Sequence, residues 1–586
     1  MNFFRIILIF LIGFCVYGQN NPQKPPVKKI KHIHSDVMKT TPLKFEGNPF
    51  AYGNVVFDHD GTKLYSDSAV WYQDLNFFRA WSRVRIINDT VSMASDSLEY
   101  DGNTRIAKGF DNVHLKDQKS ELFADYVEYN RLTDVAVATG NVVMIDPSQR
   151  IETPHMIYDR KTGIARTDAG AIIRGNDGTV THTQTLVYNA NSKVIEFDRQ
   201  VSIETPEYKI DSKKMTMNQT TGETVFLDYS RVSDRKDPTN YILMPEGGGV
   251  FNKRTGEAFL NKRSTVYRQG KELHGNQMYF NDKTGYGWAK GDVLMDDPDE
   301  QRFIRGEYAE AYRDLDSAYV TQNAYAVKAF KTDSLYFHAD TLMAVQRKDS
   351  TRIIKGYFNA RFFKSNAQGK ADSIVYNETK GILKFFRDPI MWSSEQQITG
   401  DTIYAYNNVI KEVMDSVRVW NNAFAISKVD SLTEKDFNQV KGKFMLGLYL
   451  DNKLDWIEVH ENAQSVTFVD EEADPAKNKP KERIGINLSD CGIIEADING
   501  NDVDVLSCRI QATSKLYPES KLPDKSKYLK DFQWRGDEMM KRWQDIFDNP
   551  PEHLLIKPNP ENPQGEIILL DDLTNENSDE SKENEE

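Results

Sequence analysis

A short unit with a period of 29 or 30 residues recurs along this chain, and it limits the folds open to it more than any other feature. Each copy has a small polar pair followed by alternating apolar positions that end in an apolar or aromatic residue. The first copies are DSLEY, DYVEY, PHMIY, QTLVY and KKMTM, whose last residues lie at positions 100, 129, 158, 188 and 217. Further copies follow as NQMYF, DSLYF, DSIVY and DTIYA. Apolar side chains two residues apart are typical of a β strand with one apolar face.

Turn residues follow each strand, and a second strand then returns. The first turn is Asp101-Gly102-Asn103, and the returning strand passes through an Ala-x-Gly pattern at Ala107 and Gly109. Two strands cannot enclose a core alone, so neighbouring units must stack. The sequence therefore predicts an all-β repeat protein, a β-jelly roll or β-solenoid, with one short helix over 537–547.

The termini differ from the repeats in composition. Residues 1–18 hold one basic residue, Arg5, and then an apolar run far shorter than the roughly 20 residues of a membrane-spanning helix, which predicts a cleaved export signal. An uncleaved anchor, or a lipid on Cys15, is the alternative. The expected segments are a signal peptide 1–18, a leader 19–44, a first repeat region 45–230, an irregular insertion 231–270, a second repeat region 271–430, a C-terminal β module 431–548 and a disordered acidic tail 549–586.

Two cysteines remain once the signal is removed, Cys491 and Cys508. They flank Asn499-Gly500, the preferred dipeptide of a two-residue hairpin turn. Counted outward from that turn, Ile498 faces Asn501 and Cys491 faces Cys508, so a cross-strand disulfide is feasible. Two buried free thiols, or a shifted register, are the alternative.

Patterns of catalysis and of metal or cofactor binding do not stand out. The ten histidines are scattered, and no Walker loop, nucleophile elbow or dinucleotide fingerprint occurs. The acids at 296–299 fall at an expected turn rather than in a calcium loop. The net charge is −14, of which half comes from residues 571–586, and no long basic run offers a nucleic-acid surface. We expect no enzyme, no cofactor, no metal site and no nucleic-acid partner. The less favoured alternative is a β-solenoid carbohydrate-active enzyme, which would need clustered acids.

The repeat units resemble a known family. The stretches DSLEYDGNTRIAKGFDNVHL, ADYVEYNRLTDVAVATGNVVMID and HTQTLVYNANSKVIEFDRQVSIETP are similar to the OstA-like repeats of lipopolysaccharide transport proteins, and the resemblance covers most of 45–430. Further on, LDWIEVHENAQSVTFVDE, IGINLSDC and FQWRGDEMMKRWQDIF resemble the C-terminal part of Bacteroidetes OstA-like proteins.

The resemblance implies a V-shaped β-jelly roll whose interior groove accepts the acyl chains of lipid A. Its implied role is to bind lipopolysaccharide and move it across the periplasm for outer-membrane assembly. The implied partners are other OstA-like proteins of the transport bridge and the outer-membrane translocon, joined by edge-strand stacking. The implied localisation is the periplasm, associated with the outer membrane through those partners. The groove candidates are Leu98, Tyr100, Val127, Tyr129, Met156, Tyr158, Leu186, Tyr188 and Met215.

Two other interpretations remain open at this point. The same side chains can simply pack against one another as a core. A structural scaffold or surface adhesin of the envelope would then use the repeats without a lipid groove.

Overall fold

The computed structural model describes residues 28–331, 333–429, 435–471, 482–500, 502–551 and 554. Within them the regular structure is β strand apart from short 3-10 turns, so the prediction of an all-β, repeat-built fold is confirmed. The chain divides into two compact units between Lys193 and Val194. The predicted signal sequence lies outside the described residues, and of the predicted acidic tail only 549–551 and 554 lie inside them.

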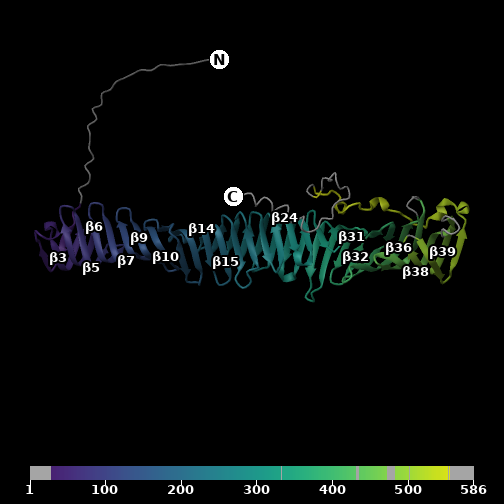
Figure 1. The fold of residues 1–586 in the computed structure, drawn as a ribbon, viewed down its shortest axis with the longest axis horizontal. Coiled ribbons are helices and arrows are strands. Elements are labelled where there is room, and N and C mark those ends of the chain that lie inside the picture. The colour runs from purple at the N-terminus through teal and green to yellow at the C-terminus, as the bar shows by residue number, and fades with distance from the viewer. Residues whose placement is uncertain are drawn as a thin grey trace, which may run out of the picture. The chain divides into compact units, whose positions relative to one another are not determined.

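Unit 1 contains antiparallel strands that pair mainly with their neighbours in sequence, side by side in Figure 1 from purple to blue. Its strands are β1 (Lys31–His34), β2 (Val37–Lys39), β3 (Phe50–His59), β4 (Thr62–Tyr72), β5 (Phe77–Ile87), β6 (Ser92–Asp101), β7 (Ile106–Lys116), β8 (Glu121–Asn130), β9 (Val135–Ile145), β10 (Gln149–Asp159), β11 (Ile164–Thr167), β12 (Ala171–Gly175) and β13 (Val180–Asn189). One 3-10 turn, η1 (Phe45–Gly47), precedes β3.

Most repeat copies form a strand, a turn and a returning strand, as expected. The copy DSLYF differs, because its strand, β28 (Ser334–His338), pairs with β27 (Tyr325–Ala329) and β30 (Arg352–Lys364) and not with the strand that follows it. In β6 and β7, Leu98 lies opposite Gly109 and Tyr100 lies opposite Ala107, so a small residue faces each large one. The turn between them is closed by Asp101, whose carboxylate accepts a hydrogen bond from the backbone N–H of Asn103 at 2.8 Å. Local sequence therefore fixes both the register and the turn.

The long strands bend in the middle, and the repeated aspartate holds the bend. Asn112 in β7 and Asn141 in β9 have left-handed backbone angles, with φ of 48° and 45°, where the ladder shifts register. Their side chains donate hydrogen bonds to Asp96 at 2.7 Å and to Asp125 at 2.9 Å. Gly140 has φ of 78°, and a Cβ there would lie 2.5 Å from a carboxylate oxygen of Asp125. A β-bulge with left-handed residues thus turns each strand sharply.

The bend divides every long strand between two half-sheets. We call half-sheet A the part whose strand ends meet at turns such as 101–104, and half-sheet B the part whose ends meet at turns such as 117–120. Alternate side chains of both halves point into the interior; in unit 1 these include Val127 of A and Leu122 of B, which are 0% and 1% exposed. The core of the unit lies between its two half-sheets.

Unit 2 repeats the same plan, with several strands broken at the bend into two short ones. Its strands are β14 (Val194–Glu204), β15 (Tyr208–Asn218), β16 (Glu223–Phe226), β17 (Ser230–Asp234), β18 (Tyr241–Met244), β19 (Gly249–Asn252), β20 (Glu257–Leu260), β21 (Ser264–Arg268), β22 (Lys271–Gly275), β23 (Gln277–Asn281), β24 (Tyr286–Asp297), β25 (Arg302–Tyr312), β26 (Ser317–Thr321), β27 (Tyr325–Ala329), β28 (Ser334–His338), β29 (Thr341–Gln346), β30 (Arg352–Lys364), β31 (Ala367–Asn377), β32 (Ile382–Phe386), β33 (Ile390–Ser393), β34 (Gln396–Thr399), β35 (Thr402–Asn408), β36 (Val413–Lys428), β37 (Phe437–Leu450), β38 (Lys453–Glu471), β39 (Glu482–Asn499), β40 (Asp502–Arg509) and β41 (Thr513–Tyr517).

The segment 231–270, where the sequence repeat loses its register, also carries paired strands. β18 pairs with β17 and β21, and β19 pairs with β16 and β20. Gly247 and Gly248 separate β18 from β19 with φ of 70° and 79°. Here the bend falls between two short strands instead of inside one long strand, as it also does between β11 and β12 of unit 1.

The hairpin of β39 and β40 differs in register from the prediction. Asn499 lies opposite Asp502, so the two-residue loop begins at Gly500, and Cys508 lies opposite Ile494 rather than opposite Cys491. The expected register is wrong because the loop starts one residue later and the ladder shifts again between Asp497 and Ile498. Cys491 and Cys508 are nonetheless joined as a disulfide, with Cα atoms 5.7 Å apart.

Beyond β41 the chain has no further strand in its described part. Residues 518–548, which we call the strap, contain the 3-10 turns η5 (Glu519–Lys521), η6 (Asp524–Lys527), η7 (Gly536–Glu538) and η8 (Trp543–Ile546); two others, η2 (Pro298–Glu300) and η3 (Arg313–Leu315), lie in strand connections. The helix predicted over 537–547 is thus two single turns, η7 and η8. In Figure 1 the strap, in yellow, runs back along unit 2 from β39 toward β31.

Candidate functional site

The predicted groove residues lie on one face of half-sheet A, and that face is buried. Eight of them are in unit 1, and Met215 is on β15 of unit 2. Their exposed fractions lie between 0% and 4%. The structure therefore gathers the eight of unit 1 on an inward face; that any of the nine contacts lipid stays a prediction.

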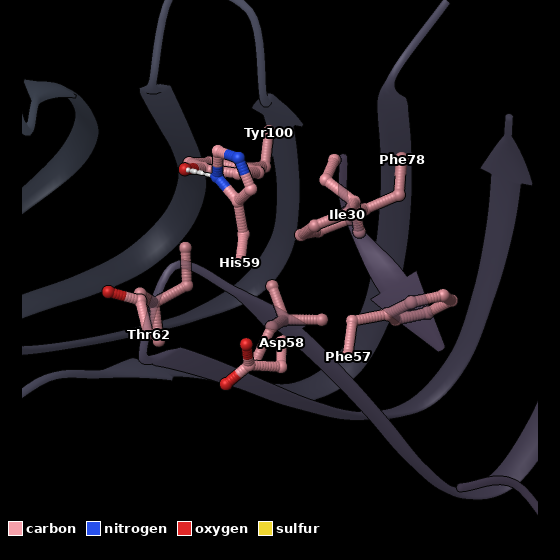
Figure 2. A pocket seen from close by; sticks show the side chains of 9 residues that line it. Ile30, Phe57, Asp58, His59, Thr62, Phe78 and Tyr100 are labelled. Carbon is pink, nitrogen blue, oxygen red and sulfur yellow. Dashed lines mark hydrogen bonds between the residues drawn. The ribbon is translucent and has the colours of Figure 1, made fainter. Parts of the chain in front are cut away.

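The interior of unit 1 is closely filled. Facing residues of half-sheet B, among them Met93, Met144 and Ile151, are exposed by 2% or less. A cavity near the first strands, shown in Figure 2, has a volume of about 10 Å³, lined among others by Ile30, Phe57 and Tyr100. That volume is about the minimum for one water molecule, so it has no room for an acyl chain.

Hydrogen bonds join the two half-sheets along the margin opposite the bends, which we call the seam. Figure 2 shows the first of them, in which His59 of half-sheet B and Tyr100 of half-sheet A meet with 2.7 Å between Nδ1 and the hydroxyl. Arg131 donates to the same hydroxyl at 2.8 Å. Burial lowers the pKa of His59, which favours its neutral form.

The next seam contact is built around a buried arginine. Arg160 donates to the Tyr129 hydroxyl at 3.0 Å and pairs with Asp134 at 2.6 Å and with Asp117 at 3.2 Å. Tyr158 reaches Asp117 across the seam at 3.3 Å. The Arg160 side chain is only 7% exposed, so its pairs with the carboxylates are screened little by solvent.

The acid of this contact is held ionised by its own turn. Burial alone would raise the pKa of Asp117, but backbone N–H donors of Lys119 and Ser120, followed by the charge of Arg160, lower it overall. Burial raises the pKa of Tyr129 and of Tyr158 to about 12, so both hydroxyls stay neutral donors.

A third contact repeats the pattern with lysine in place of arginine. Tyr188 donates to Asp146, and Lys193 donates to Asp146 and to the Tyr188 hydroxyl at 2.9 Å each. Asp146 also accepts the backbone N–H of Ser148 at 2.7 Å. The seam of unit 1 is therefore closed by a series of contacts between a tyrosine and a cation, with an acid in the second and the third. Sequence reasoning treated these tyrosines as groove residues and missed their polar partners, although the 31-residue spacing from Tyr100 to Arg131 and from Tyr129 to Arg160 is visible in the sequence.

A larger cavity lies between the half-sheets of unit 2. Its volume is about 70 Å³, several times the space that one water needs. On the half-sheet A side it is lined by Leu454, Ile457, Ile494, Ala496, Ile498, Val503 and Leu506, and on the half-sheet B side by Gln396, Gln397, Ile398, Ala425, Ile426, Ser427, Asn438, Gln439, Val440, Ser465 and Thr467.

One wall of this cavity is apolar and the other mixed. At the seam, Gln396 donates from Nε2 to the carbonyl of Gly500 at 3.1 Å. Such a lining suits an apolar ligand with a polar end, because aliphatic groups gain from burial while a hydroxyl such as that of Ser465 offers a hydrogen bond. None of the nine predicted groove residues lies here. The sequence analysis divided this lining between the second repeat region and the C-terminal module, and predicted no cavity, because the lining residues come from several strands far apart in the sequence.

Metal ligands are not gathered in the described part of the chain: no group of three or more His, Cys, Asp or Glu side chains is placed to hold an ion. The same residues include no helix long and apolar enough to cross a membrane.

Comparison with known proteins bears on the first strands. Residues 27–140 match the family model described as OstA-like protein. The chain is OstA-like over these residues. No curated protein sequence matches it. Among solved structures, LptH of Pseudomonas aeruginosa, described as the LptA homologous periplasmic component of the lipopolysaccharide transport device, is 17% identical over 20% of this chain and 83% of its own, with a TM-score of 0.19.

The OstA-like region runs from β1 into β9. It contains the first predicted groove residues and the contact of His59 with Tyr100 and Arg131. The contact of Lys193 with Asp146 and Tyr188 and the 70 Å³ cavity lie beyond it. Arg160 also lies beyond it, although its partners Asp117, Tyr129 and Asp134 lie within it. The match is thus narrower than the resemblance over 45–430 that the repeats suggested.

Proposed function

We propose that this protein binds lipopolysaccharide and carries it across the periplasm for outer-membrane assembly, with acyl chains held between the half-sheets. The observation that carries the proposal is the cavity of unit 2, in which Ile457, Ile494, Leu506 and other apolar side chains line an interior space. Each buried methylene contributes roughly 0.8 kcal/mol, so about ten would supply roughly 8 kcal/mol before ordering costs.

The comparisons support the part of this proposal that concerns lipopolysaccharide transport. The OstA-like match of residues 27–140 fits a family associated with lipopolysaccharide transport, and LptH is described as a periplasmic component of such a device. On this proposal the chain is a non-enzymatic carrier in the periplasm. Its partners are lipid A and other OstA-like proteins, which would dock by strand pairing at an edge such as β41, whose one strand partner in the described residues is β39.

A structural scaffold of the envelope is the second candidate. The closely packed interior and closed seam of unit 1 favour it, because a filled roll needs no ligand to be stable.

Photo-crosslinking in living cells tests the proposal. A photoreactive amino acid is placed at Ile457 in the cavity, at Met156 and Leu186 in unit 1, and at Glu458 as the matched control. Glu458 is the neighbour of Ile457 on β38, so its side chain points to the opposite face. We expect a lipopolysaccharide adduct at Ile457 and none at Glu458. If the protein is folded and exported but gives no adduct at any inward position, the scaffold is the better account.

A further inference from the structure

The outward face of half-sheet B in unit 2 carries one continuous row of buried and half-buried residues. Successive ladder pairs connect its members across β25, β27, β28, β30, β31, β33, β34, β36, β37, β38 and β39. The row is Phe303, Val327, Tyr336, Phe363, Gln368, Trp392, Gln397, Ile426, Gln439, Val466 and Leu488. An outward row with this much apolar surface needs a cover.

The strap is that cover, and glutamines of the row bind its backbone. Gln439 donates from Nε2 to the carbonyl of Lys527 and accepts the N–H of Leu529, each at 2.9 Å. Gln397 does the same with Gln533 and Arg535, each at 2.7 Å.

Gln368 extends the series. Its Nε2 donates to the carbonyl of Met540 at 3.0 Å, and its Oε1 accepts the N–H of the same residue at 2.5 Å. All three glutamines are exposed by 9% or less. An amide that both donates to and accepts from a backbone recognises an extended chain whatever its side chains, as a neighbouring strand would.

Aromatic side chains fill the spaces between the glutamines. Phe437 contacts Phe532 and Trp534, with ring centroids 5.3 Å apart in both pairs. Farther along, Trp543 stacks on Tyr336 at 4.7 Å. These contacts anchor the strap at two separate places on the sheet.

Ion pairs complete the attachment. Glu538 pairs with Lys370, and with Arg535 at 2.6 Å; Asp548 pairs with Arg361. The pair of Glu538 with Arg535 lies within the strap, and the sheet makes the other contacts with side chains of its outer face. The strap can therefore leave without breaking the strand ladders beneath it.

Three residues belong to both the strap's seat and the cavity. Gln397, Ile426 and Gln439 line the cavity, although their side chains face the strap. Because side chains alternate along a strand, their neighbours Ile398, Ala425 and Val440 point inward. The wall of the cavity is thus one strand layer thick, and the strap supports it from behind.

The cavity of about 70 Å³ is too small for a whole acyl chain, so its walls must separate before one can enter. We propose that the strap is a releasable brace that sets the width of this cavity: seated, it keeps the half-sheets together, and released, it lets half-sheet B move outward. This inference rests on the proposed function only for the identity of the ligand. By linkage, a ligand that widens the cavity also weakens the seating of the strap.

The test uses the full chain with a reporter cysteine, Ala425→Cys, on the cavity wall. The reagent is a maleimide with a long alkyl tail, and its labelling rate measures how often the cavity opens. Gln368→Leu and Trp534→Ala, singly and together, weaken the strap at positions outside the cavity lining. Gln464→Leu is the control, because the amide of Gln464 contacts Asp490 at 2.9 Å and not the strap. Amide hydrogen exchange over 527–548 reports release of the strap.

We expect the labelling rate to rise about tenfold for the single variants, in step with strap exchange, since each loses one or two hydrogen bonds or a ring contact. The control should match the parent protein. Unchanged labelling in a variant whose strap exchanges freely would overturn the brace, as would a strap that stays protected in the double variant.

Lipopolysaccharide crosslinking at Ile457, measured in the same variants, separates this inference from the proposed function. Strap-dependent labelling without any lipid adduct supports the brace and contradicts the carrier. A lipid adduct that forms equally in all variants, with labelling unaffected, supports the carrier and contradicts the brace.

Discussion

Replacing Arg160 by methionine should open the seam of unit 1 at one place. The change removes hydrogen bonds to Tyr129, Asp134 and Asp117 and leaves Asp117, whose side chain is 11% exposed, without its nearest cation. Breaking a buried pair from one side costs about 3 kcal/mol or more, because the remaining charge stays buried. We therefore expect the free energy of unfolding to fall by about 3 kcal/mol.

Arg131→Met is the matched control, one repeat earlier. Arg131 donates to the Tyr100 hydroxyl at 2.8 Å and to the His59 carbonyl at 3.4 Å, and neither of these acceptors is a carboxylate. Loss of such hydrogen bonds costs about 1 kcal/mol. The two variants should thus differ by about 2 kcal/mol, although both remove the same side chain from equivalent positions.

The free energies of unfolding of the variants are compared by urea denaturation followed by circular dichroism. The comparison is valid if the dependence of that free energy on urea concentration is the same in all variants. Asp117→Asn added to Arg160→Met should recover about 1 kcal/mol, because it removes the unpaired charge. If the two arginine variants differ by less than about 0.5 kcal/mol, the seam charges are not coupled in the way the structure implies.

Other predictions concern the bend, the strap and the seam tyrosines. Gly140→Ala should lower the free energy of unfolding, measured by urea denaturation, by about 1–2 kcal/mol, because φ is 78° there and the added methyl meets a neighbouring carboxylate. The control Gly61→Ala, where φ is 79° and the space around the Cβ is open, should lower it less. The hydrogen bond from Arg535 lowers the pKa of Glu538 to about 2. The stabilisation of the strap by the ionised Glu538 is therefore complete above pH 4.5 and lost as the pH falls toward 2. Hydrogen exchange of the strap should rise over that range, and should rise less in Glu538→Gln. Burial raises the pKa of Tyr129 to about 12, so the stabilisation of the fold by its neutral hydroxyl is complete below pH 10 and lost as the pH rises to 12. The free energy of unfolding should fall over that range, and should fall less steeply in Tyr129→Phe than in the parent protein.

The strands could be predicted because each is specified by its own residues. Leu98 and Tyr100 alternate with polar neighbours, and Asp101 closes the turn that follows, so a few adjacent residues determine strand, face and turn. The bend was not predicted, although Asp96 belongs to the small polar pair that begins the repeat copy DSLEY. The role of Asp96 depends on Asn112, which lies on the next strand in a left-handed conformation that no periodicity signals.

The seam, the cavity and the strap depend on residues far apart in the sequence. Arg160 meets Asp117 across 43 residues, and Gln368 meets Met540 across 172. The strap has no regular apolar period because the glutamines of the sheet bind its backbone, and not one face of a helix or strand. The prediction of a helix over 537–547 is therefore wrong, and the structure has two separate turns there.

At two places the seam also makes one repeat depend on the next. The Tyr100 hydroxyl takes its donor from Arg131, and that of Tyr129 takes its donor from Arg160, each one unit later in the chain. A unit placed last in a row would thus lack this cation, unless it carried a substitute of its own, as Tyr188 does with Lys193 only five residues away. An array cut after Tyr188 and Lys193 would keep that pair intact, whereas one cut just after Tyr129 would not, so these contacts mark where a shortened protein can end.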